Sequence, residues 1–286
     1  MSTKIPSSEL ILNADGSVYH LHLLPEDLAD TVILVGDPER VPQVSKHFDR
    51  IELVKQKREF ITHTGYIGNE RLTVLSTGIG TDNIDIVLNE LDILSHVNML
   101  TREVKSEKRD LKLIRVGTSG ALQADIEVDS ILVSTHGLGL DHLTWYYEVE
   151  PDKDVIYLKD ELGLDFLKPY LFNANADLLA KFDQQSMKGI TATCSGFYAP
   201  QGRYLRAGIK SMALVERLSA IRIDGLRVTN FEMETAAILG LSKLFGFKAI
   251  AVNAIVANRI THQFSSNGQA TIDKTIQYTL ETLLKK

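Results

Sequence analysis

The chain has 286 residues, of which 44% are hydrophobic and 24% are charged, with a formal net charge of -6 and a single cysteine, Cys194. This length and apolar content exclude a disordered or low-complexity chain, and the acidic balance argues against a general polyanion binder. One cysteine excludes an intramolecular disulfide, and no apolar run approaches the length of a bilayer span, so we expect a soluble cytoplasmic protein.

Short runs rich in β-branched residues alternate with longer helical patterns from Val32 to Ala257, which predicts a layered α/β fold around a largely buried sheet. The predicted strands are Thr31 to Val35, Ile51 to Lys55, Ile61 to Ile67, Arg71 to Ser76, Lys112 to Gly117, Ser130 to His136, Gly189 to Cys194, Val228 to Asn230 and Ala249 to Ala257. The predicted helices are Val41 to His47, Asp82 to His96, Asp165 to Lys188 with a break at Pro169 and Asn173, Leu205 to Arg222, Glu232 to Phe245 and Ala270 to Lys286.

No repeat or Pro/Ser-rich linker marks a boundary, so we predict a single domain over residues 1–286, a three-layer α/β/α arrangement with a mixed central sheet. Residues 1–18 form an N-terminal extension of this framework. Mixed charges mark residues 101–110 as a surface insertion, and residues 148–160 are predicted to be a second one.

Three predicted strands end in loops suited to an anion. Gly36 to Arg40 combines a small residue, a proline and an arginine, and Arg115 to Gly120 places an arginine and a hydroxyl residue around glycine. A buried arginine requires an anionic partner, and the free amides at a helix start attract phosphate, as at Ser76 to Asp82. Each loop alone has an alternative: Gly-Asp-Pro is a common turn, an arginine at a strand end usually pairs with a carboxylate of the same fold, and Gly-x-Gly before a helix is as often a packing device as a ligand site. None matches a Walker or dinucleotide-binding sequence, so the three together favour a small phosphate ion.

Two further segments carry polar side chains of a specific kind. In Cys194 to Arg203, an amide (Gln201) and a guanidinium (Arg203) stand two residues apart, and their donors and acceptor match the edge of uracil. In Asn230 to Thr235, Glu232 is expected in irregular backbone and Glu234 at the helix start, where the carboxylates suit a ribose diol. A solvated turn and a simple N-terminal helix cap are the respective alternatives.

Taken in order along the chain, these segments resemble the uridine phosphorylase branch of the hexameric-type nucleoside phosphorylase family. The resemblance runs from His20 to Arg259. It rests on Gly36-Asp-Pro-x-Arg40, Arg58-Glu59-Phe60, Ser76-Thr77-Gly78-Ile79-Gly80, Arg115-x-Gly-Thr118-x-Gly120, Phe197-Tyr198-x-x-Gln201-x-Arg203, Glu232-Met233-Glu234 and Asn258-Arg259.

The resemblance implies phosphorolysis of uridine to uracil and ribose 1-phosphate, as in pyrimidine salvage, by a homodimer or hexamer with shared active sites. Inorganic phosphate is then a co-substrate, and neither an organic cofactor nor a structural metal, nucleic acid or membrane partner is expected. The residues that it implies for phosphate are Gly36, Arg40, Arg115, Thr118 and, from the neighbouring subunit, Arg58. Those for ribose are His20, also from that subunit, Glu232, Met233 and Glu234, and those for the base are Phe197, Gln201, Arg203 and Arg259. Gln201, Arg203, Arg115 and Glu234 are the expected catalytic set.

The sequence departs from the family pattern at Thr81 to Asn83 and at Ala199-Pro200. The first change puts in doubt the monovalent-cation site that some relatives form at a dimer interface near Glu59 and Ile79. The alternatives are a purine nucleoside phosphorylase of the same fold and a non-catalytic nucleoside-binding protein. The first is disfavoured because Val256 to Arg259 holds no aspartate to protonate a purine, and the full set of ligand-type residues disfavours the second.

Overall fold

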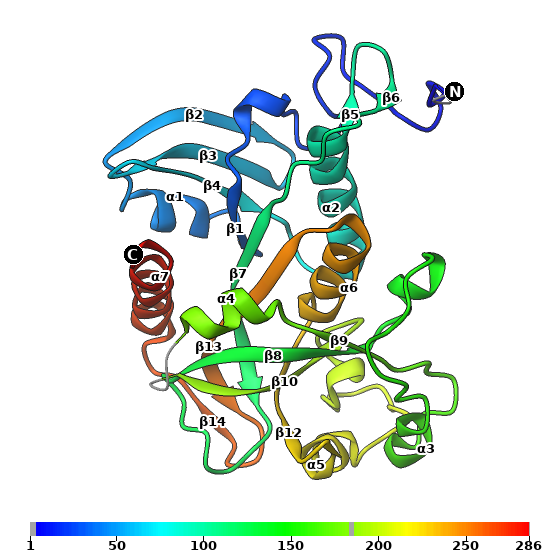
Figure 1. Ribbon diagram of the computed structural model, residues 1–286. Coiled ribbons are helices and arrows are strands. Elements are labelled where there is room, and N and C mark those ends of the chain that lie inside the picture. Colours follow the sequence, from blue (N-terminus) through cyan, green and yellow to red (C-terminus); the bar gives the residue numbers. More distant parts are fainter. Residues whose placement is uncertain (1–3, 183–185, 286) are drawn as a thin grey trace. The chain divides into compact units, whose positions relative to one another are not determined.

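The computed structural model describes residues 4–182 and 186–285, which fall into two compact units (Figure 1). Unit 1 comprises residues 1–114 and 245–248, and unit 2 comprises residues 115–244 and 249–286. The first three residues of the predicted N-terminal extension, residues 183–185 of a predicted helix and the last residue of another lie outside the described residues. The prediction of a single domain stays a prediction.

Unit 1 is built on a mixed sheet of four strands in the order β1-β4-β3-β2, in which β1 and β4 are parallel and the other pairs are antiparallel. Helix α1 packs against β3 and β4. The elements are η1 (Pro25–Asp27), β1 (Thr31–Val35), α1 (Arg40–Ser45), β2 (Arg50–Lys57), β3 (Phe60–Ile67), β4 (Glu70–Ser76), α2 (Thr81–His96), β5 (Val97–Asn98) and β6 (Glu103–Val104).

Unit 2 is centred on strand β10, which is parallel to β8 on one side and to β12 on the other. Strand β13 adds to β8 in the antiparallel sense, and β12 also pairs with the end of β7. Its elements, with β7, α6 and β13 crossing a unit boundary, are β7 (Lys112–Ala121), β8 (Ile131–Leu140), η2 (Leu143–Tyr146), α3 (Leu158–Leu162), β9 (Tyr170–Asn173), α4 (Ala176–Lys181), β10 (Met187–Cys194), η3 (Ala199–Gln201), α5 (Leu214–Ala220), β11 (Arg222–Ile223), β12 (Leu226–Glu232), α6 (Thr235–Phe245), β13 (Lys248–Asn258), β14 (Gln263–Phe264) and α7 (Gly268–Leu284).

The predicted α/β class with a mixed sheet is confirmed, and all nine predicted strands are present. Two predicted helices are wrong in extent. The segment predicted as a broken helix from Asp165 contains β9, paired antiparallel with β8, followed by the short α4 and the start of β10. The helix predicted over Leu205 to Arg222 is formed only as α5, because the residues before Leu214 are irregular backbone.

The two predicted insertions differ in how they are held. Residues 101–110 are exposed or half-buried, and Arg102 joins them to the N-terminal segment: its backbone carbonyl accepts a hydrogen bond from Ile5 N at 2.8 Å. Residues 148–160 are anchored more deeply, because Val155 and Leu158 are fully buried in the apolar core of unit 2.

Candidate active site

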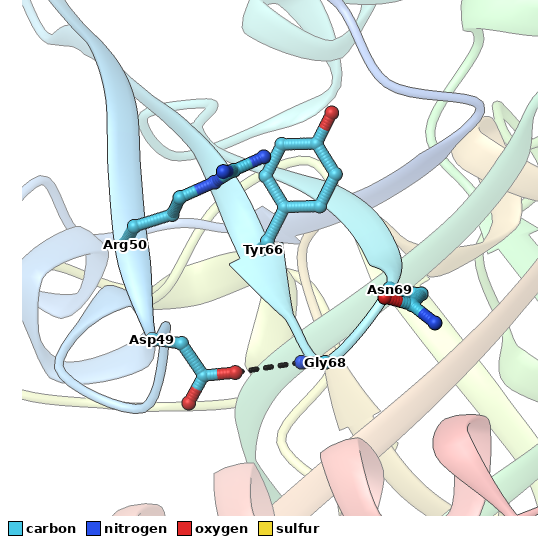
Figure 2. Close-up of a pocket in the computed structure, with 5 residues that line it drawn as sticks. All are labelled: Asp49, Arg50, Tyr66, Gly68 and Asn69. Atoms are coloured by element: carbon cyan, nitrogen blue, oxygen red, sulfur yellow. Dashed lines mark hydrogen bonds between the residues drawn. The ribbon is translucent and has the colours of Figure 1, made fainter.

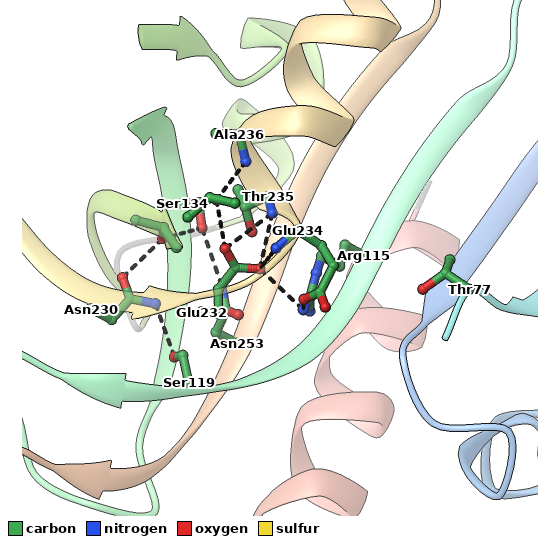
Figure 3. A network of polar contacts seen from close by, with 12 residues as sticks. Thr77, Arg115, Ser119, Ser134, Asn230, Glu232, Glu234, Thr235, Ala236 and Asn253 are labelled. Atoms are coloured by element: carbon green, nitrogen blue, oxygen red, sulfur yellow. Dashed lines mark hydrogen bonds and ion pairs between the residues drawn. The ribbon is translucent and has the colours of Figure 1, made fainter. Parts of the chain in front are cut away.

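A buried arginine of unit 2 lies against two carboxylates. Arg115, on β7, places Nη2 3.0 Å from Oε2 of Glu232 and also donates to Oε2 of Glu234, and all three side chains are at least 94% buried (Figure 3). Burial alone would lower the pKa of Arg115, but the charges of Glu234 and Glu232 raise it. We call Arg115, Glu232 and Glu234 the ionic cluster.

The carboxylate of Glu232 is fully used by the protein. Glu232 ends β12, and its oxygens accept hydrogen bonds from Thr193 Oγ1 at 2.7 Å, from Glu234 N at 3.0 Å and from Thr235 N at 2.9 Å, besides Arg115. A carboxylate offers about four acceptor positions, so Glu232 caps helix α6 and orients Arg115. The expectation that Glu232 lies in irregular backbone and that Glu234 begins the helix is wrong, because α6 begins at Thr235.

The second terminal nitrogen of Arg115 is a buried donor without an acceptor. Within the part of the chain that the structure describes, Nη1 is buried and has no hydrogen-bond partner. Buried donors are almost always satisfied in native proteins, so an orphaned one marks a place for a ligand or water. A guanidinium held by two carboxylates and still presenting a donor is suited to an oxyanion. Thr118, three residues on, is half-buried.

Gly117 provides the space for this guanidinium. Residues 115 and 117 point to the same face of β7, and a Cβ added at Gly117 would lie 1.4 Å from Arg115 Nη1. We expect Gly117→Ala to displace the guanidinium and to lower kcat/KM by about 100-fold, the scale expected for a misplacement of about 1 Å. It should also lower the melting temperature, because the displaced guanidinium is paired with the buried carboxylates of Glu232 and Glu234. Steady-state kinetics and thermal melting measure the two effects. Gly120→Ala is the matched control, since its added Cβ meets nothing closer than 3.6 Å. Equal activities of the two variants would contradict the expectation.

A buried ladder of hydroxyl and amide side chains fixes the strands next to the ionic cluster (Figure 3). Asn230 Nδ2 donates to Ser119 Oγ at 2.9 Å, and Asn230 Oδ1 accepts from Thr191 Oγ1 at 2.9 Å. The ladder continues through Ser134, 2.6 Å from Thr191, to Asn253. It links β7, β12, β10, β8 and β13, so the strand ends that carry Arg115 and Glu232 have little freedom to shift. Met233 is half-buried in the turn that follows β12.

Phe197, Gln201 and Arg203, three of the four residues predicted to bind a base, lie in the loop after β10, and the fourth, Arg259, follows β13 and contacts this loop. Arg203 Nη1 donates to the carbonyl of Phe197 and to Oε1 of Gln201, both at 2.6 Å, and its guanidinium carbon lies 3.7 Å from the centre of the Phe197 ring. Arg259 Nη1 donates to the carbonyl of Gln201 at 3.1 Å. Gln201 is buried and Phe197 is half exposed. The contact with Arg203 orients the Gln201 amide, leaving one lone pair on its oxygen and two N–H donors for a ligand.

The buried ring of Phe231 lies next to both Arg203 and Arg259, whose guanidinium carbons are 5.9 Å and 5.5 Å from its centre. Burial and the charge of Arg259 lower the pKa of Arg203 to about 10, and burial also lowers the pKa of Arg259. Arg203 therefore stays charged at neutral pH. Two half-buried positive charges on neighbouring segments, Arg203 after β10 and Arg259 after β13, favour a ligand that is electron-rich or becomes negative.

In unit 1, the loops after β1 and β4 lie side by side. The parallel register sets Val35 opposite Ser76, and Thr77 N donates to the carbonyl of Val35 at 2.7 Å. A Cβ on Gly36 would lie 3.4 Å from the carbonyl oxygen of Gly78, which is an ordinary van der Waals contact. Arg40 is buried at the start of α1. The structure thus brings Gly36 and Arg40 onto one strand-to-helix junction, as the sequence predicts.

Arg58 and His20 occupy turns of unit 1. Arg58 is exposed in the β2–β3 turn with a φ of 56°, and its guanidinium carbon lies 5.9 Å from the ring centre of Tyr19. His20 is half-buried and contacts Glu90 of α2, with Nδ1 2.8 Å from Glu90 Oε1. Asn83 Nδ2 donates to the carbonyl of Ile79 at 3.4 Å. The doubt that Thr81 to Asn83 casts on a monovalent-cation site near Glu59 and Ile79 stays a prediction.

A separate hollow of about 270 Å³ lies at the start of β2 and the β3–β4 turn, and it is lined by Asp49, Arg50, Tyr66, Gly68 and Asn69 (Figure 2). Two of its polar groups contact other lining residues: Asp49 accepts from Gly68 N at 2.7 Å, and the Arg50 guanidinium carbon lies 4.1 Å from the Tyr66 ring centre. It contains none of the predicted site residues.

The described residues hold neither a cluster of metal-ligating side chains nor a helix suited to a bilayer. No group of three or more His, Cys, Asp or Glu side chains is placed to hold a metal ion among residues 4–182 and 186–285. No helix in the same ranges is both long enough and apolar enough to cross a membrane.

Three residues that contact predicted site residues were not predicted from the sequence: Glu90, Thr193 and Phe231. Glu90 had a readable signal, because it stands on the buried face of α2 with apolar neighbours at Val87 and Leu94. A lone acid in an apolar stripe requires a partner. Thr193 and Phe231 carry no such signal, because their roles depend on contacts between different strands.

The sequence and structure are similar to known phosphorylases. The family model of the Phosphorylase superfamily matches residues 30–283. A uridine phosphorylase of Thermococcus kodakarensis is 32% identical over 94% of this chain and 87% of its own length, and the Escherichia coli uridine phosphorylase is 28% identical over 85% and 86%. The crystal structure of a Trypanosoma brucei nucleoside phosphorylase, described as showing uridine phosphorylase activity, covers 96% of this chain and 99% of its own with a TM-score of 0.87 and 30% identity.

Proposed function

Because the chain belongs to the phosphorylase superfamily, which confirms the predicted family, we propose that it catalyses phosphorolysis of uridine to uracil and ribose 1-phosphate. The arrangement of side chains in the loop after β10, residues 195–203, is the observation that favours uracil as the base. The oriented amide of Gln201 offers an acceptor for N3–H and donors for a carbonyl, and Arg203 offers further donors, while Phe197 gives an aromatic surface for the ring.

The reaction joins a phosphate oxygen to C1′ as the bond from C1′ to N1 of uracil breaks. The electron pair of that bond leaves on the base, and the proton of monohydrogen phosphate ends on uracil. Gln201, Arg203 and Arg259 stabilise the negative charge that develops on the pyrimidine, an electrostatic effect of about 3–4 kcal/mol per well-aimed donor. No protein side chain has to act as a general acid or base, because the phosphate supplies the proton. Holding phosphate and nucleoside in the reactive orientation supplies a further part of the rate enhancement.

We assign phosphate binding to Arg115, through its orphaned Nη1, and to Thr118. Gly36, Arg40 and, from a neighbouring subunit, Arg58 keep the phosphate roles that the resemblance implies. Glu234 and Met233 contact the ribose, and Glu232 acts by holding Arg115 and the start of α6. The active protein is a homo-oligomer that shares residues between subunits, with phosphate as co-substrate and no organic cofactor.

A phosphorolysis assay tests the function. Purified protein is incubated with uridine, thymidine, deoxyuridine or inosine, with and without inorganic phosphate, and the free base and sugar phosphate are measured. We expect phosphate-dependent release of uracil from uridine and no release of hypoxanthine from inosine. Preferential cleavage of inosine would make the protein a purine phosphorylase, and binding of uridine without turnover would make it a nucleoside-binding protein.

A further inference from the structure

The backbone around His20 is a tight turn fixed from two sides. His22 N donates to the carbonyl of Val18 at 3.1 Å, and Val18 N donates to the carbonyl of Leu23 at 3.0 Å. From β2, Lys57 Nζ donates to the carbonyl of Tyr19 and lies 4.6 Å from the centre of the Tyr19 ring. These contacts therefore fix the backbone that carries the His20 imidazole.

The remaining fixation comes from a single buried carboxylate on helix α2. Oε1 of Glu90 accepts hydrogen bonds from His20 N at 2.7 Å and from His20 Nδ1 at 2.8 Å, and Oε2 accepts from Leu21 N at 2.7 Å. The Glu90 side chain is 8% exposed and that of His20 is 27% exposed. Burying a carboxylate is costly unless it is well paired, and here all three donors belong to the segment that carries His20.

This contact determines which nitrogen of the neutral ring carries the proton. A carboxylate only accepts hydrogen bonds, so Nδ1 must be the donor to Glu90. In the neutral ring the other nitrogen, Nε2, is then an acceptor, and it is the one left to face a ligand. An acceptor at this place fits a hydroxyl group, which donates, and does not fit an esterified 5′ position.

We propose that Glu90 is a positioning residue: it fixes the orientation and tautomer of His20, so that Nε2 accepts a hydrogen bond from the 5′-hydroxyl of the nucleoside. The inference rests on the proposed function, because it takes a ribonucleoside as the ligand of His20. It adds a specificity element for an unmodified 5′-hydroxyl, located in unit 1 on the helix that carries the buried stripe of Val87 and Leu94.

Comparing two substrates separates this role from a structural one. Values of kcat/KM are measured for uridine and for 5′-deoxyuridine, which lacks the hydroxyl, with wild type, Glu90→Gln, His20→Ala and the double variant. Because Gln presents an NH₂ group where Glu90 accepts, Glu90→Gln is expected to lower kcat/KM for uridine about three- to tenfold, the size of one hydrogen bond. The value for 5′-deoxyuridine should not change, and Glu90→Gln should have no further effect in the His20→Ala background.

The matched control lies on the same helix. Asp92 pairs with His96, with Oδ1 2.6 Å from Nδ1, so Asp92→Asn breaks a carboxylate–imidazole contact of the same kind without touching His20. It should leave the ratio of the two substrates at the wild-type value. If Glu90→Gln melts below the assay temperature, the ratio is taken from Glu90→Asp, which keeps the charge but withdraws the oxygens.

An equal loss with both substrates, or a loss that persists without His20, would overturn the assignment of Glu90. Failure of the wild-type protein to release uracil from uridine would instead overturn the proposed function. The two results are distinguishable, because the first requires an active wild-type enzyme.

Discussion

Replacing Arg115 by alanine should lower the free energy of unfolding and abolish phosphorolysis. The substitution leaves the carboxylates of Glu232 and Glu234 buried without their cation, and breaking a buried ion pair by removing one partner costs about 3–5 kcal/mol. It also removes the donor assigned to phosphate. Urea denaturation gives the free energy of unfolding, and initial rates at varied phosphate give the loss of activity.

The exposed pair between Arg227 and Asp125 is the matched control. Its two hydrogen bonds, at 2.8 and 2.9 Å, are as well formed as any in the ionic cluster, but the side chains are 39% and 62% exposed. Arg227→Ala should therefore cost at most about 1 kcal/mol and leave turnover unchanged. Adding Glu234→Gln to an Arg115→Met variant should recover part of the lost stability, because one buried charge is removed while the Glu232 contacts to α6 are kept, but it should not recover activity. A stable, active Arg115→Ala protein would refute the role of the cluster.

Arg203→Ala should lower kcat for uridine by about 100- to 1,000-fold, which is the usual effect of losing one donor that stabilises a developing negative charge. The loss of the Arg203 contact should also free the Gln201 amide, so Gln201→Ala should add less in the double variant than alone. The measurement is steady-state release of uracil with saturating phosphate.

Arg206, three residues further along the same loop, is exposed and serves as the control for Arg203. Arg206→Ala should leave kcat and KM at their wild-type values. If the two arginine variants were equally active, uracil recognition would have to lie outside this loop.

Structural elements could be predicted correctly where the signal for them lay within a short stretch of the sequence. Strand β1 was predicted to the residue, because an apolar run ends at Gly36. The segment after Asp165 was misread because its apolar residues Leu167, Tyr170 and Leu171 fit the i, i+3, i+4 spacing of a helix. Pairing of β9 with β8 decided the outcome, and no short window of sequence contains that information.

The same distinction holds for the site. The kinds of residue needed for an anion, a sugar and a base could be predicted because they sit in short motifs with recognisable chemistry. Their supports could not, since Thr193 is 39 residues from the carboxylate that it contacts and Glu90 is 69 residues from the amide of Leu21. Only the fold specifies such pairs.

The Glu232 carboxylate contacts three segments: it caps α6, accepts a hydrogen bond from a hydroxyl on β10 and pairs with a guanidinium on β7. Its oxygens are satisfied only after these segments have come together. Unit 2 therefore folds and assembles its ionic cluster in the same step. A partly unfolded form of unit 2 is expected to have no activity. Evolutionary change at this carboxylate is consequently constrained twice, once by chemistry and once by folding.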